Sequence, residues 1–91
     1  MKRVHVVIRG DVQNVGFRSW TKAKAGHFGV AGWVKNTDDG AVEAVFEAED
    51  EKKVDELVEE CRRGPPGSYV EGVDVEEEVF RGEFEGFDII I

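Results

Sequence analysis

The stretch Gly10-Asp11-Val12-Gln13-Asn14-Val15-Gly16-Phe17-Arg18 decides the fold, because it joins the end of a predicted strand to the start of a predicted helix. Before it, the side chains of residues 4–9 alternate between the two faces of a strand. After it, apolar side chains recur at helical spacing from Phe17 to Phe28. The junction therefore predicts a strand, a tight loop and an amphipathic helix of about three turns.

This junction is also a candidate anion site. The first N–H groups of a helix have no intrahelical acceptor, and the helix dipole adds partial positive charge there. Gly10, Asn14 and Gly16 can adopt backbone angles that curl successive N–H groups into a nest, and Arg18 can bind two oxygens of one phosphate. A plain loop remains the alternative, since the stretch matches neither common Gly-rich nucleotide-binding pattern.

Length and composition indicate one domain that folds without covalent or metal cross-links. The 91 residues contain one cysteine, Cys61, and two scattered histidines, so neither a disulfide framework nor zinc-ligand spacing is present. No apolar run approaches the roughly 20 residues of a membrane span, and no signal peptide is evident, which predicts a soluble cytoplasmic protein. Abundant Glu, Lys and Arg also suggest a thermostable protein.

Charge is distributed unevenly along the chain. Residues 1–37 carry seven Lys or Arg against one Asp, a net charge of +6, whereas residues 38–91 carry five against nineteen, a net charge of −14. The overall charge of −8 disfavours non-specific binding to nucleic acids or membranes. The basic segment around the candidate loop is still able to attract a small anion, although scattered, solvated charges explain the composition equally well.

The rest of the chain predicts an α+β domain. A second helix is expected to start at Asp50 as its N-cap, and Cys61 falls on its apolar stripe as a packed core residue. Further strands are expected over residues 30–37, 41–48, 69–79 and 87–91. The order β-α-β-β-α-β, plus a short C-terminal strand, is typical of the ferredoxin-like split βαβ sandwich, in which two helices pack on one face of an antiparallel sheet. The apolar face of the closing strand, Phe87, Ile89 and Ile91, is expected to complete the core.

Two stretches together resemble the acylphosphatase family. The family pattern G-x-V-Q-G-V-x-F-R is met by Gly10, Val12, Gln13, Val15, Phe17 and Arg18. A second pattern, G-[FYW]-V-x-N-x-x-x-G-x-V, is met by Gly32, Trp33, Val34, Asn36, Gly40 and Val42. The order and spacing of the motifs and the chain length all fit. Two positions depart from the family: Asn14 and Ala48 stand where glycines are usual.

The resemblance implies that the chain hydrolyses acyl phosphates to a carboxylate and orthophosphate, without a metal or organic cofactor. It implies a phosphate-binding role for Arg18 and a water-orienting role for Asn36. The remaining residues of the phosphate-binding loop would be Val12, Gln13, Asn14, Val15, Gly16 and Phe17. The expected partners are the acyl phosphate and inorganic phosphate as product or inhibitor, with no nucleic acid or membrane, and with a monomer favoured.

Two other functions fit the same fold. A non-catalytic module could bind phosphate or carbamoyl phosphate for a partner, and hydrolysis of benzoyl or acetyl phosphate by pure protein would separate it from an enzyme. An RNA-binding sheet is the second alternative. The acidic charge and the lack of an RNP1-like aromatic pattern disfavour it.

Overall fold

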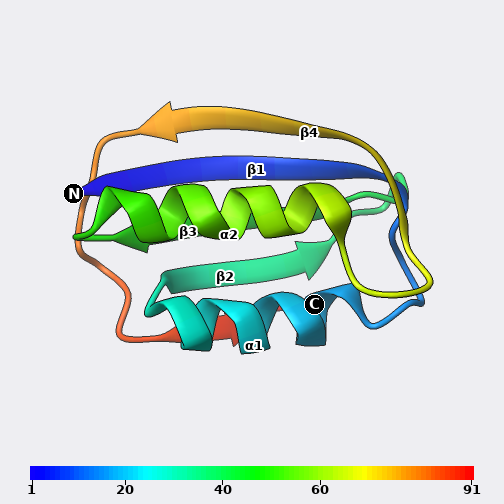
Figure 1. The fold of residues 1–91 in the computed structure, drawn as a ribbon, viewed down its shortest axis with the longest axis horizontal. Helices are drawn as coiled ribbons and strands as arrows, with labels where there is room; N and C mark the ends of the chain where they lie inside the picture. Colours follow the sequence, from blue (N-terminus) through cyan, green and yellow to red (C-terminus); the bar gives the residue numbers. More distant parts are fainter.

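The computed structural model describes all residues, 1–91, and contains five strands and two helices in the predicted order (Figure 1). Their bounds are β1 (Lys2–Asp11), α1 (Phe17–Phe28), β2 (Ala31–Asn36), β3 (Val42–Ala48), α2 (Glu51–Arg63), β4 (Tyr69–Glu78) and β5 (Phe87–Ile89). The predicted ferredoxin-like sandwich is therefore confirmed. Both helices lie on the same face of the sheet, in front of it in Figure 1.

The sheet has the strand order β4-β1-β3-β2-β5. The first four of these strands pair antiparallel, as predicted, whereas β5 pairs parallel to β2, with Gly32 opposite Phe87 and Val34 opposite Ile89. The β1–α1 loop and the β2–β3 turn lie at one end of the sheet, at the right in Figure 1. The two sequence motifs therefore meet in space, because β1 and β2 flank β3 and both run antiparallel to it, so that their C-terminal ends lie at the same end of the sheet.

The core lies between the helices and the sheet. The helical faces are as expected, with Phe17, Thr21 and Ala25 buried on α1. On α2 the buried residues are Val54, Leu57, Val58 and Cys61. Burial raises the pKa of the Cys61 thiol to about 12, which keeps it protonated at neutral pH and confirms its prediction as a packing residue.

The prediction for the closing strand is wrong in part. Phe87 is buried against Phe46, but Ile89 and Ile91 are 39% and 76% exposed. The physical reason is position, because β5 is a three-residue edge strand: Phe87 packs into the core, whereas Ile89 lies at its margin, where it stays partly open to solvent. At the opposite edge, the residues Glu76, Glu77 and Glu78 of β4 are exposed, as expected of an acidic edge strand.

The helices begin differently. The N-cap of α2 is Asp50, whose side chain accepts a hydrogen bond of 3.0 Å from the N–H of Lys52, as predicted. The N-cap of α1 is Gly16, which makes no side-chain cap hydrogen bond, and no acidic residue lies in the first turn. The positive end of the α1 dipole is therefore left without an anion from the protein.

A cluster of charged side chains around the buried Arg3 and Glu47 lies at the end of the sheet away from the two motifs. The guanidinium of Arg3 lies 2.9 Å from Glu78, 2.6 Å from Glu83 and 3.5 Å from Glu47. Glu47, 3% exposed, also accepts hydrogen bonds from the N–H groups of Arg81 and Glu83. Residues 79–86 connect the two edge strands across this end of the sheet, so the cluster fastens the crossing to β1 and β3.

Candidate active site

The β1–α1 loop has the backbone conformation that an anion nest requires. At Gly10 the register between β1 and β4 shifts, and a Cβ there would lie 2.2 Å from the carbonyl oxygen of Tyr69. Further along, Asn14 and Gly16 have φ angles of 63° and 76°, in the left-handed region. Asn14 is the one non-glycine residue with positive φ, which is the conformation expected where the family has glycine.

The loop presents a continuous set of backbone donors without acceptors. No N–H group from Val12 to Gly16 donates a hydrogen bond within the chain. Helical hydrogen bonding in α1 begins only with the N–H of Trp20, which donates to the carbonyl of Gly16, so the N–H groups of residues 17–19 are also free. Unsatisfied amides at an uncapped helix N-terminus form a binding site for an oxyanion.

Arg18 is a cation without a partner in a strongly acidic protein. It is the second residue of α1 and is half-buried, yet no carboxylate lies within ion-pair distance of it. No hydrogen bond within the chain involves its guanidinium. A half-buried guanidinium with all its donors free is arranged to bind an external anion.

Asn36 lies at the end of β2, next to the β2–β3 turn. Its backbone is fixed on both sides, because it faces Val42 in the β2–β3 ladder and donates a hydrogen bond of 2.8 Å to the carbonyl of Ile91. Its side-chain amide makes no hydrogen bond within the chain. The backbone is thus held while the amide is available to a ligand or a water molecule.

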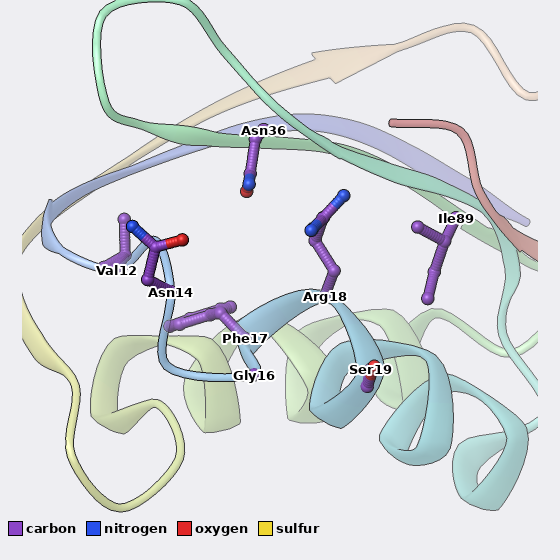
Figure 2. Close-up of a pocket in the computed structure, with 8 residues that line it drawn as sticks. All are labelled: Val12, Asn14, Gly16, Phe17, Arg18, Ser19, Asn36 and Ile89. Atoms are coloured by element: carbon purple, nitrogen blue, oxygen red, sulfur yellow. The ribbon is translucent and has the colours of Figure 1, made fainter.

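Arg18 and Asn36 line one cavity of about 180 Å³. Figure 2 shows the guanidinium extending from α1 and the amide extending from the sheet into the same space. The other lining residues are Val12, Asn14, Gly16, Phe17, Ser19 and Ile89. Arg18 is the only titratable side chain among the eight, so the cavity contains no carboxylate, imidazole, thiol or phenol that could act as a general acid or base.

Five of the seven residues predicted for the phosphate loop line this cavity, and two do not. Val15 packs against the core. The side chain of Gln13 turns away and donates hydrogen bonds of 2.8 and 2.9 Å to the carbonyl oxygens of Thr37 and Ala41. Sequence reasoning missed two lining residues. Ser19 carried a weak signal as a polar residue in the first helical turn, whereas Ile89 had none, because the parallel pairing of β5 brings it there.

The chain contains neither a candidate metal centre nor a candidate membrane-spanning helix. No three His, Cys, Asp or Glu side chains come together in an arrangement that could ligate a metal ion. Neither helix has the length and apolar character needed to traverse a lipid bilayer.

Comparisons with known proteins agree on one family. The family model described as acylphosphatase matches residues 4–89. The chain is 53% identical over 88 residues to an acylphosphatase from Syntrophobacter fumaroxidans, covering 97% of this chain and 90% of that protein. The crystal structure of acylphosphatase from Bacillus subtilis superposes with a TM-score of 0.95 over the whole of both chains, at 35% identity. At 27% identity and a TM-score of 0.77, the chain also matches 12% of full-length HypF, solved in a phosphate- and nucleotide-bound form.

Proposed function

Because the chain belongs to the acylphosphatase family and is an acylphosphatase acting on a small acyl phosphate, we propose that the loop of residues 12–18, Arg18 and Asn36 form its catalytic site. The observation that carries this proposal is the shared cavity. An unpaired guanidinium, a run of free amides and an unpaired side-chain amide face one small space.

The first step is binding of the phosphoryl group. Its oxygens accept hydrogen bonds from the free N–H groups of residues 12–19, and Arg18 binds two of them through parallel N–H donors. The same donors stabilise the charge that the equatorial oxygens carry in the transition state of phosphoryl transfer. Since the donors are already in place before substrate binds, this stabilisation requires little reorganisation of the protein.

The second step is attack by water. The side-chain amide of Asn36 holds a water molecule in line with the bond between phosphorus and the bridging oxygen. The water oxygen bonds to phosphorus, the bridging oxygen leaves with the bonding electrons as part of a carboxylate, and orthophosphate remains. An asparagine amide cannot take a proton at neutral pH, so Asn36 orients the water and does not act as a base.

One proton of the attacking water stays on the incoming oxygen, and the other passes to an oxygen of the phosphoryl group, so that the product is protonated orthophosphate. This route is supported by the cavity, where Arg18 is the only titratable side chain. A carboxylate is a stable leaving group that needs no general acid, which fits the same lining. The pH–rate profile is therefore expected to show no ionisation of an enzyme base between about pH 5 and pH 8.

The finer partner assignments follow from the same site. Orthophosphate, the product, is expected to inhibit competitively because it occupies the phosphoryl position. Cations on the open face of the sheet lie near carboxylates, with Lys35 3.6 Å from Glu43 and Arg9 3.3 Å from Asp74. This pairing supports a function without nucleic acid.

The test is the substitution Asn36→Ala, measured with benzoyl phosphate. We expect kcat to fall by about 10²-fold, as when one preorganised group of a catalytic site is removed, while the inhibition constant of phosphate changes little. Lys35→Ala is the matched control, since Lys35 precedes Asn36 on the same strand and contacts Glu43 instead of the cavity. Loss of phosphate inhibition in the Asn36 variant would place Asn36 in the phosphate site and contradict its role in orienting water.

A further inference from the structure

The two halves of the proposed catalytic site come from different elements. Arg18 and the free amides belong to the β1–α1 connection, whereas Asn36 ends β2. In-line attack requires a fixed separation between the phosphoryl group and the water. The loop that binds the phosphoryl group therefore has to be held in place relative to the end of β2.

The side chain of Gln13 makes that connection. Its amide nitrogen donates to the carbonyl of Thr37 at 2.8 Å and to the carbonyl of Ala41 at 2.9 Å. Thr37 directly follows Asn36, and the N–H of Thr37 donates to the carbonyl of Ala41 at 2.9 Å, closing the turn. One side chain thus uses both its N–H donors to hold the first and last residues of the turn beside Asn36.

Two further observations separate Gln13 from the binding residues around it. Its side chain does not line the cavity, although residues 12 and 14 on either side of it do. It also makes the only side-chain hydrogen bonds that leave the loop of residues 12–16. No backbone N–H of the loop donates to the rest of the chain, so these two bonds are the loop's only hydrogen bonds to the β2–β3 turn, in addition to the packing of Val12 and Val15 against the core.

From these contacts we propose that Gln13 is a positioning residue, which fixes the distance and direction between the phosphate-binding loop and the amide of Asn36. This inference rests on the proposed function, because it assigns Gln13 to the geometry of that site. It does not act on the substrate. Its removal lets the turn and the loop move independently, which misaligns the attacking water while the phosphate site itself persists.

Gln13→Met tests this directly, since it keeps the length of the side chain and removes both donors. With benzoyl phosphate we expect kcat to fall by about 10-fold to 10²-fold, as for a misplacement of about 1 Å, with KM and phosphate inhibition changing less than about threefold. Gln13→Asn keeps the amide on a shorter side chain, and its kcat is expected to lie between those of the Gln13→Met variant and the wild type. Loss of phosphate inhibition in the Met variant would instead make Gln13 a phosphate ligand and overturn the inference.

A double-mutant cycle distinguishes positioning of Asn36 from a general effect. In the Asn36→Ala background, Gln13→Met is expected to lower kcat by less than about twofold, because the group it positions is gone. An equal fold-loss in both backgrounds would show that Gln13 acts independently of Asn36. Val54→Ala in the core of α2 is the stability control: it lowers the urea midpoint and leaves kcat of the folded protein unchanged.

A measurement that does not depend on turnover completes the test. In a titration of 15N-labelled protein with phosphate, the wild type is expected to show shifts in the amides of residues 12–19 and also in those of residues 37–41. In Gln13→Met the loop shifts persist and the turn shifts are lost. Turn shifts that survive would overturn the inference, whereas absent loop shifts in the wild type would instead refute the proposed phosphate site.

Discussion

Arg3 and Arg18 lie at opposite ends of the same sheet and differ in their ion-pair partners. Arg3, 8% exposed, lies within ion-pair distance of three carboxylates and stacks over the ring of Phe84 at 5.1 Å. Arg18 is half-buried and has no carboxylate within ion-pair distance. In a chain with 20 Asp and Glu residues, an arginine without a partner is informative. The comparison fits a stabilising role for Arg3 and supports the proposed role of Arg18 as a ligand of the phosphoryl group.

The largest expected effect is on catalysis, from Arg18→Ala. We expect kcat/KM for benzoyl phosphate to fall by about 10³-fold, or about 4 kcal/mol of transition-state stabilisation, together with loss of phosphate inhibition. The free energy of unfolding is expected to change by less than about 1 kcal/mol, because no hydrogen bond or ion pair within the protein is removed. Arg18→Lys keeps the charge without the paired donors and is expected to recover only part of the activity. A large loss of stability in the Arg18→Ala variant would show that Arg18, like Arg3, stabilises the fold.

The counterpart is Arg3→Ala, which is expected to act on stability alone. Removing the cation leaves Glu47 buried without its charge partner, and breaking such a pair costs about 3 kcal/mol. Urea denaturation measures this loss, and kcat of the folded protein at 25 °C is expected to match the wild type. A fall in kcat would show that the two ends of the sheet are coupled and that Arg3 does not act on stability alone.

A smaller effect, and one that depends on pH, is expected from Glu47→Gln. Burial by itself raises the pKa of the Glu47 carboxyl, but hydrogen bonds from the N–H groups of Arg81 and Glu83 and the charge of Arg3 outweigh burial and hold that pKa below its ordinary value of 4.5. The stabilisation is therefore complete above about pH 4.5 and is lost as the pH falls through the lower pKa of the folded state.

We expect Glu47→Gln to lower the free energy of unfolding at pH 7 by about 2 kcal/mol, the size of hydrogen bonds to a charged group. Below pH 4.5 the difference from the wild type is expected to shrink, because the wild-type carboxyl then becomes neutral too. Urea titrations at a series of pH values measure both quantities. A difference that stays constant down to pH 3 would mean that the charge of Glu47 contributes nothing.

The smallest effect is expected at Asn14, which stands where the family has glycine. Its φ of 63° is open to glycine without steric cost, but glycine also has more freedom in the unfolded chain. These terms oppose each other, so Asn14→Gly is expected to change the free energy of unfolding by less than about 1 kcal/mol. Phosphate inhibition is expected to persist, since the backbone N–H remains. Its loss would assign the phosphate contact to the Asn14 side chain.

The helices and strands could be predicted because apolar residues recur along the sequence at helical or strand spacing. The burial of Phe17, Thr21 and Ala25 on α1 and the Asp50 cap of α2 follow from local spacing and local hydrogen bonding, so the sequence predicts them directly. The prediction that Ile89 belongs to the core was wrong, because alternation within a strand does not reveal whether the strand is central or at the edge of the sheet. The fold class survives such an error, since one short edge strand adds little to the core.

Contacts between residues far apart in the sequence could not be predicted for the site. The free amides and Arg18 were predictable, because a strand–loop–helix junction creates them locally. Glu47 as the partner of Arg3, and Thr37 as the acceptor of Gln13, depend on register across the sheet, which no local pattern specifies. The role expected of Asn36 came from the family resemblance, and the structure adds that its amide faces the same cavity as Arg18.

The most direct measurement is a crystal structure of the protein grown or soaked with phosphate. The free loop and its unpaired guanidinium predict a phosphate ion within hydrogen-bonding distance of Arg18 and of several N–H groups from residues 12–19, with the amide of Asn36 on the opposite side of the ion. Phosphate bound elsewhere on the surface, with the loop empty at saturating concentration, would contradict the assignment of this cavity as the catalytic site.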